Sequence, residues 1–60
     1  MSLLREVVNN NVVTYAIAEA LIKDCKEDLE SLRTVEEKKI WVEECLNVSG
    51  DYYKEVEEFS

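Results

Sequence analysis

Apolar residues recur along the chain at alternating intervals of four and three residues, which is the spacing of one face of an α-helix. From residue 4 to residue 32 this face has a single polar member, Asn11. Its positions are Leu4, Val8, Asn11, Tyr15, Ala18, Ile22, Cys25, Leu29 and Leu32. The spacing predicts a first helix over about residues 3–32.

Three consecutive asparagines, Asn9, Asn10 and Asn11, weaken the first part of this predicted helix. Asparagine has a low helix propensity and is also common as a helix N-cap, so the tract could instead mark the start of the helix. Because the surrounding residues are largely β-branched, we expect packing to hold this half of the helix. Asn11 is interpreted as a residue that fixes the register of the packed helices.

A turn over about residues 31–34 separates the first helix from a second one. Thr34 and Glu37 have the S/T-x-x-E form of a capping box, in which each side chain accepts a hydrogen bond from the backbone of the other residue. The second helix is therefore expected over about residues 35–59. Its apolar positions again recur by three and four, and aromatic residues, Trp41 among them, widen the apolar face.

The chain contains no proline, and its single glycine is Gly50. Ser49 and Gly50 could break the second helix, with Ser49 capping a separate last helix. The apolar positions stay in phase across the pair, however, and this favours a continuous or slightly kinked helix in which Gly50 faces Ala18. Because the connection between the helices is short, they are expected to be antiparallel neighbours. The predicted fold is all-α, a single antiparallel two-helix hairpin domain over residues 1–60.

The back of the first helix carries an apolar patch that a two-helix monomer would expose. The patch consists of Val13, Ile17, Ala20 and Leu21. A chain of 60 residues buries only about 60% of its unfolded surface, so we expect help from another chain. The first interpretation is a homodimer in which two hairpins form a four-helix bundle, with the patch at its centre. The second is docking of the patch onto a different, larger protein.

Composition adds a strong negative charge, since fourteen acidic residues against seven basic ones give a formal net charge of −7. This field opposes direct binding to a nucleic-acid backbone. Many of the acids fall on the back of the second predicted helix. They include Glu37, Glu44, Asp51, Glu55 and Glu58. A solvated helix face is the ordinary interpretation, but such a face could also meet a basic partner or imitate DNA phosphates.

The chain contains no histidine, which excludes Ser-His and Cys-His nucleophilic arrangements within one chain. Cys25 and Cys45 form no CxxC motif that would indicate a zinc site, and no glycine-rich phosphate loop is present. We therefore predict no enzymatic activity and no catalytic, cofactor or metal site. The cysteines are interpreted as buried free thiols, although a strained disulfide between them is conceivable.

The N-terminus lacks the pattern of a signal peptide, and two cysteines without a disulfide framework are typical of a reducing compartment. The longest apolar run, residues 12–22, is well short of the ~20 residues that span a bilayer. A cytoplasmic protein without a membrane anchor is predicted. Trp41 and the other aromatic residues share the phase of the apolar faces and are interpreted as core or interface anchors.

The predicted layout resembles that of the Rop-type plasmid RNA-binding regulators, which are small acidic helical hairpins that dimerise. The likeness is one of architecture, because no motif matches residue by residue.

Three functional hypotheses follow from these features. The first is a non-enzymatic interaction module, an adaptor, chaperone or inhibitor that binds a larger protein as a hairpin dimer. The second is a DNA mimic that uses the acids of the second helix. The third is a Rop-like regulator that binds nucleic acid directly through the basic residues of a dimer face. Those residues are Arg5, Lys23, Lys26 and Arg33.

Overall fold

A computed structural model describes residues 2–60, and these residues form four α-helices and one short 3₁₀ helix without any strand. In chain order they are α1 (Leu3–Asn11), α2 (Tyr15–Leu29), α3 (Val35–Leu46), η1 (Gly50–Tyr52) and α4 (Tyr53–Glu58). The prediction of an all-α fold is confirmed. The four helices nevertheless replace the two long ones that the periodicity predicted.

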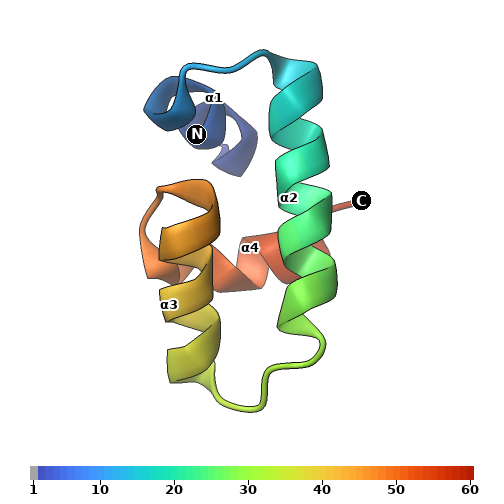
Figure 1. Cartoon of the computed structure of the whole chain (residues 1–60), viewed down its shortest axis with the longest axis vertical. Coiled ribbons are helices and arrows are strands. Elements are labelled where there is room, and N and C mark those ends of the chain that lie inside the picture. The colour runs from blue at the N-terminus through green and yellow to red at the C-terminus, as the bar shows by residue number, and fades with distance from the viewer. Residues whose placement is uncertain (1) are drawn as a thin grey trace.

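The two longest helices, α2 and α3, lie side by side and run in opposite directions (Figure 1). Helix α1 packs against α2, and α4 crosses behind α2 and α3 in the view of Figure 1. A hairpin of two helices of 25 to 30 residues would be about 40 Å long, whereas the longest extent of the molecule is 30 Å. The chain is shorter and thicker than the predicted hairpin because each predicted helix is broken once.

The prediction of one helix over residues 3–32 is wrong, because α1 and α2 are separate elements. At the break Val12 adopts the left-handed conformation, with φ 54° and ψ 54°, and its N–H donates to the carbonyl of Val8. Thr14 then caps α2, since its hydroxyl accepts a hydrogen bond from the amide of Ile17 at 3.2 Å. A left-handed residue followed by an N-cap ends one helix and starts another within three residues.

The asparagine tract ends α1 and does not start a helix. The side-chain amide of Asn11 donates to the carbonyl of Val7 at 3.0 Å and to that of Leu46 at 2.7 Å. Asn10 and Asn47 exchange hydrogen bonds, each side-chain amide donating to the other residue's carbonyl, at 2.8 Å and 3.1 Å. The last carbonyl groups of a helix lack partners within it, and these amides supply partners that also hold the C-terminal ends of α1 and α3 together.

The predicted start of the second helix is confirmed in detail. The hydroxyl of Thr34 accepts from the amide of Glu37 at 3.1 Å. In return the Glu37 carboxylate accepts from the amides of Thr34 and Arg33, at 3.3 Å and 3.1 Å. Both halves of the capping box are therefore present, and α3 begins at the next residue.

The prediction of a continuous second helix over residues 35–59 is wrong, and the break at Ser49 that the sequence also allowed is present. Helix α3 ends before Asn47, which is left-handed with φ 57°. The hydroxyl of Ser49 then accepts from the amide of Asp51 at 3.2 Å and starts η1. Asparagine tolerates the left-handed conformation better than most residues, so Asn47 both ends α3 and allows the chain to turn back.

Gly50 packs closely against α3, whereas the sequence placed it opposite Ala18. A Cβ atom at this position would lie 2.8 Å from both the Cβ and the carbonyl oxygen of Lys39. The Gly50 amide also donates to the carboxylate of Glu43 at 3.3 Å. Glycine is needed here because the backbone of the η1 segment approaches the backbone of α3 directly.

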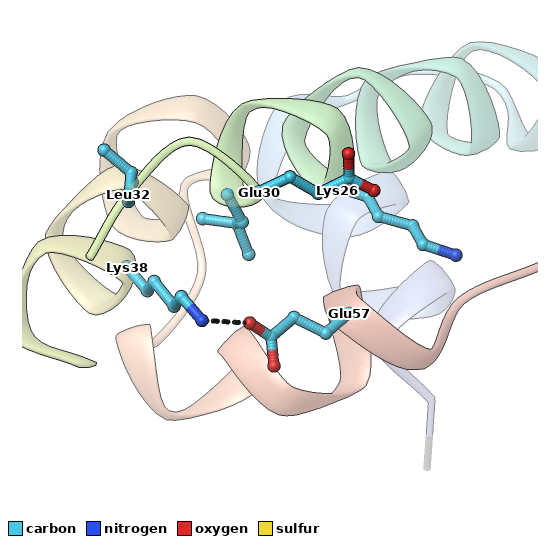
Figure 2. A pocket seen from close by; sticks show the side chains of 6 residues that line it. Lys26, Glu30, Leu32, Lys38 and Glu57 are labelled. Carbon is cyan, nitrogen blue, oxygen red and sulfur yellow. Dashed lines mark hydrogen bonds and ion pairs between the residues drawn. The ribbon is translucent and has the colours of Figure 1, made fainter. Parts of the chain in front are cut away.

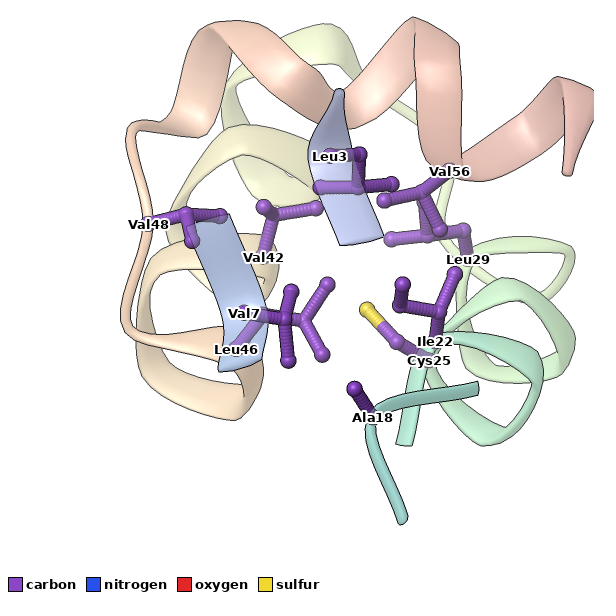
Figure 3. Packing of buried hydrophobic residues seen from close by; sticks show 10 residues of the cluster. All are labelled: Leu3, Val7, Ala18, Ile22, Cys25, Leu29, Val42, Leu46, Val48 and Val56. Carbon is purple, nitrogen blue, oxygen red and sulfur yellow. The ribbon is translucent and has the colours of Figure 1, made fainter. Parts of the chain in front are cut away.

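One apolar core joins all four helices (Figure 3). Its buried members are Leu3, Val7, Ala18, Ile22, Cys25, Leu29, Val42, Leu46, Val48 and Val56. Four of the α2 members, Ala18, Ile22, Cys25 and Leu29, belong to the apolar face that the periodicity predicted. The periodicity therefore identifies the core side of α2 over these four residues, whereas in α1 the buried residues are Leu3 and Val7 and the predicted positions Leu4 and Val8 are half-buried.

Candidate interaction surface

The structure divides the predicted apolar patch between core and surface. Val13 and Leu21 are half-buried and pack against the core. Ile17 is 50% exposed, and Ala20 is exposed beside it. The short first helix α1, which the sequence did not predict as a separate element, accounts for part of this burial because it packs against α2.

Ile17 and Leu21 lie on the flank of α2 that continues, eleven and seven residues further along, to Asp28 at the border with α3. Residues 17, 21, 24 and 28 recur at intervals of four and three, so their side chains share one flank of the helix. On this flank Asp28 accepts a hydrogen bond from the indole N–H of Trp41 in α3, at 3.1 Å. Trp41 and Cys45 are one turn apart and therefore face the same border from the α3 side. The apolar side chains along this border, here called the α2–α3 strip, are Ile17, Leu21, Trp41 and Cys45.

The α2–α3 strip combines exposure with a fixed position. Trp41 is 36% exposed and Ile17 is 50% exposed, while Leu21 and Cys45 are half-buried against the core. The hydrogen bond from Trp41 to Asp28 holds the indole across the junction of the two helices. A large aromatic side chain that is already ordered loses little conformational entropy when it binds a partner.

Carboxylates surround the α2–α3 strip. On α2 the flank continues into Asp24 and Asp28, which are both exposed. On α3 the exposed residues Glu37 and Glu44 are spaced four before and three after Trp41, so they lie on its side of the helix. The strip is therefore an apolar surface with an acidic rim.

The lysines of α2 and α3 that have partners bind residues of the C-terminal segment. The ammonium of Lys38 pairs with Glu57 of α4 at 2.6 Å, and that of Lys39 pairs with Asp51 at 3.4 Å. Lys26 donates to the carbonyl of Phe59 at 2.6 Å. These lysines tie the C-terminal segment to α2 and α3. Lys38 lies three residues before Trp41 and seven before Cys45, so it shares their side of α3, but its ammonium pairs with Glu57 of α4.

A cavity of about 350 Å³ lies where the end of α2, the start of α3 and α4 meet (Figure 2). Its lining residues are Lys26, Leu29, Glu30, Leu32, Lys38 and Glu57. Figure 2 shows the Lys38–Glu57 ion pair between α3 and α4 beside this cavity. Charges of both signs line it, so it shows no preference for an anion or a cation, and its lysines serve to fasten α4.

The acidic residues predicted on one helix face are distributed over separate elements. Glu37 belongs to the capping box of α3, and Glu44 is exposed on the same helix. Asp51 lies in η1 and pairs with Lys39. Two further members of the predicted face are exposed on α4, which crosses α3: Glu55 and Glu58. These five acids do not form one continuous ridge, because the helix that would have aligned them is broken after residue 46.

The basic residues proposed to contact nucleic acid are likewise spread over several elements. Arg5 is exposed on α1, Lys23 is exposed on α2, and Arg33 is exposed in the connection between α2 and α3. Lys26 is half-buried and donates to the Phe59 carbonyl.

Cys25 of α2 and Cys45 of α3 lie close enough to affect each other's pKa. Both thiols are free. Burial, followed by Cys45 and Asp28, raises the pKa of the Cys25 thiol from 9.0 to about 12. Burial also raises the pKa of the Cys45 thiol. Both groups are therefore protonated at neutral pH, and a thiol is a much weaker nucleophile than a thiolate.

Trp41 was predicted as a core or interface anchor, but neither it nor Cys45 was placed in the apolar patch of the first helix. The sequence does contain the signal, because the spacing of Glu37, Trp41 and Glu44 places an aromatic residue between two acids on one flank of a helix. What the sequence could not show is that this flank meets the flank of α2 that carries Ile17 and Leu21, at the hydrogen bond between Trp41 and Asp28. That relation depends on the register of α2 against α3.

Other classes of site receive no support from the structure. Among residues 2–60 no group of three or more cysteine, aspartate or glutamate side chains is placed to hold a metal ion. In the same part of the chain no helix has the length and apolar character needed to cross a membrane. No family model, no curated protein and no solved structure matches the chain.

Proposed function

We propose that the chain is a small acidic protein-interaction module, an adaptor, chaperone or inhibitor that acts on a larger protein and has no catalytic activity of its own. The observation that supports the proposal is the α2–α3 strip, in which an ordered, partly exposed tryptophan and an exposed isoleucine lie within a rim of carboxylates. Interfaces are enriched in tryptophan, and the residues that dominate binding lie in an apolar centre with a polar surround.

Folding depends on the core and not on the exposed residues of the α2–α3 strip. Ten apolar residues are buried within the chain itself, and Ile17 and Trp41 are not among them. Substitution of either residue should therefore affect partner binding more strongly than folding. Few surface substitutions change stability by more than about 0.5 kcal/mol.

The proposal can be tested with two matched variants. Ile17→Glu places a charge in the α2–α3 strip, and Ile40→Glu places the same charge on the outer side of α3. The two isoleucines are 50% and 56% exposed, so both variants should fold equally well, as circular dichroism would verify. The immobilised full chain and both variants are used to capture proteins from an extract of the native host, and the captured proteins are compared by mass spectrometry.

We expect at least one protein to be captured by the unchanged chain and by Ile40→Glu but not by Ile17→Glu. Identical sets of proteins on all three chains would show that the strip is not an interface. A second copy of the chain is the other occupant that the sequence suggests, and it would give a homodimer. Sedimentation equilibrium of the pure protein measures that state directly.

Mimicry of DNA phosphates is a second candidate with weaker support, since the acids lie on separate elements. Glu55 and Glu58 belong to α4, whereas Glu37 and Glu44 belong to α3. Replacing Glu44, Asp51 and Glu55 with lysine would abolish binding by a mimic. A partner that binds through the α2–α3 strip should still bind this variant measurably, because the apolar residues of the strip are unchanged.

A further inference from the structure

We infer that the α2–α3 strip recognises a basic amphipathic helix of its partner, an inference that rests on the proposed function and adds the chemistry of the partner. The strip follows one flank of α2 and crosses to α3 at the hydrogen bond between Asp28 and Trp41, so a partner helix can lie along it. Its flank on α2 extends from residue 17 to residue 28, which corresponds to about 16 Å. That length accommodates about three turns of a partner helix.

Charge determines which kind of helix fits. Helical spacing places one base on the two flanks of the strip, Lys38, whose ammonium pairs with Glu57 of α4, and the other charged side chains there are four carboxylates. They are Asp24 and Asp28 on α2 and Glu37 and Glu44 on α3. Lys38 and Lys39 are paired with carboxylates outside the strip, Glu57 of α4 and Asp51 of η1. A partner with apolar side chains along one face and lysine or arginine beside them would satisfy both parts of this surface.

Asp28 connects the apolar and the acidic parts of the strip. Its carboxylate accepts the indole N–H of Trp41 through Oδ2, so a basic side chain that pairs with Asp28 would approach the edge of the indole ring. Arginine and lysine also interact favourably with the face of an aromatic ring. That contact requires the ring face, whereas the N–H edge beside Asp28 is positive, so the ion pair with Asp28 is the contact that favours a basic residue at this point.

A second copy of the chain fits the strip less well. Pairing the strip with itself would bring two acidic rims together, and each chain carries a formal charge of −7. Opposed like charges at an interface are destabilising and select against the wrong partner. The same charge attracts a basic segment and increases its association rate at low salt.

The inference is tested with a synthetic helical peptide of about 14 residues, or about four turns, with leucines at helical i, i+4 and i+7 spacing and lysines at most other positions. Trp41 is the only tryptophan of the chain, so its fluorescence reports binding to a peptide without tryptophan or tyrosine. We expect a saturable shift of the emission to shorter wavelength in the unchanged chain and in Ile40→Glu. Ile17→Glu should weaken binding by about tenfold or more.

Two control peptides separate recognition from general charge attraction. A peptide with glutamate in place of every lysine should not bind, and a peptide of the same composition with the leucines out of helical spacing should bind at least about tenfold more weakly. Equal binding of the leucine-scrambled peptide would show charge attraction alone and would overturn the inference. No fluorescence change up to about 1 mM of the designed peptide, where an interaction is worth only about 4 kcal/mol, would also overturn it.

The outcomes for the two proposals remain distinct. A strip-dependent protein captured from the host, together with no binding of the designed peptide, leaves the interaction module and rejects the basic helix. Self-association that Ile17→Glu abolishes identifies a second copy as the occupant and also rejects the basic helix. If the host extract yields no strip-dependent protein and the chain remains a monomer, the proposed function itself fails.

Discussion

Val12 is the residue whose backbone conformation suits its side chain least. Its φ of 54° lies in the left-handed region, which costs residues other than glycine about 1–2 kcal/mol and is least favourable for β-branched side chains. The side chain is 90% exposed, so burial does not compensate for this cost. The break between α1 and α2 is therefore stabilised by the neighbours of Val12, namely the bonds of Asn11 and the cap at Thr14.

Replacing Val12 with glycine should increase the free energy of unfolding by up to about 1 kcal/mol. Glycine adopts the left-handed conformation without steric cost, although its greater freedom in the unfolded chain offsets part of the gain. Urea denaturation followed by circular dichroism measures the change. Val12→Ala keeps part of the steric cost and should give a smaller increase. A Val12→Gly protein less stable than Val12→Ala would show that the left-handed backbone at this residue is not strained.

Asn11 provides the strongest single polar contact between the ends of α1 and α3. Asn11→Ala removes the donor to the carbonyls of Val7 and Leu46. Loss of a donor to a poorly solvated carbonyl costs about 1–3 kcal/mol, and the free energy of unfolding should fall by that amount in urea denaturation. Asn9 is exposed, so Asn9→Ala is the matched control and should change stability by less than about 0.5 kcal/mol. Equal effects of the two substitutions would assign the tract a role in helix propensity alone.

Among the elements, helix interiors and the start of α3 could be predicted from the sequence, whereas two helix ends could not. The capping box of Thr34 and Glu37 is local, so its residues identify it without knowledge of the fold. The break at Val12 is different, because the apolar positions before and after it keep the same intervals of four and three. The periodicity shows only which direction around the helix axis each residue faces. A turn that keeps these directions the same leaves the periodicity unchanged. The signals that remained were the asparagine tract and Thr14, and the bonds that make the tract effective come from residues 35 positions away or more.

The second break shows the same limit. Ser49 is a recognisable N-cap, but the feature that forces the chain to leave the helix is the left-handed Asn47, whose side chain donates to the carbonyl of Asn10. Since this contact spans most of the chain, a local pattern does not reveal it. The preference for a continuous helix followed only from the regular spacing of the apolar residues, and this spacing does not show whether the helix is interrupted.

Gly50→Ala should destabilise the packing of η1 against α3. The added methyl group would lie 2.8 Å from the Lys39 carbonyl oxygen, and because that atom belongs to a helix backbone it cannot move without cost. Overpacking of this kind typically costs about 1–3 kcal/mol. Hydrogen exchange should show faster exchange of the α4 amides, and urea denaturation should show the lower stability. Asp51→Ala, which removes only an exposed ion pair, should cost less than about 1 kcal/mol. A Gly50→Ala protein as stable as the unchanged chain would mean that η1 shifts freely along α3.

At the scale of the whole molecule, part of the candidate surface could be predicted and part could not. Ile17 was identified as a surface residue from its phase on the helix, and the structure leaves it half exposed. Leu21 was placed in the same patch, but it packs against the core. The contribution of Trp41 required the register of α2 against α3, which the hydrogen bond to Asp28 defines. The acidic face required a continuous second helix, and it is divided because that helix ends at residue 46.

The buried thiol at the centre of the molecule makes its stability depend on pH in the alkaline range. The pKa of Cys25 is 9.0 in its ordinary state and about 12 in the fold, chiefly because of burial and secondly because of Cys45. The folded protein therefore keeps a proton that the unfolded chain releases between these values. The stabilisation is complete below pH 9 and declines as the pH rises toward 12, at up to about 1.4 kcal/mol per pH unit.

The free energy of unfolding should accordingly decrease more steeply with pH in the unchanged chain than in Cys25→Ala. Urea denaturation between about pH 8 and about pH 10.5, with a reductant present, measures both slopes. The other titratable groups are present in both proteins, so the difference in slope reports Cys25 together with its coupling to Cys45. The alanine variant should be less stable at pH 8, because it leaves a small cavity in the core, and this difference should narrow as the pH rises. Parallel curves over the whole range would show that the thiol of Cys25 ionises as readily in the fold as in the unfolded chain.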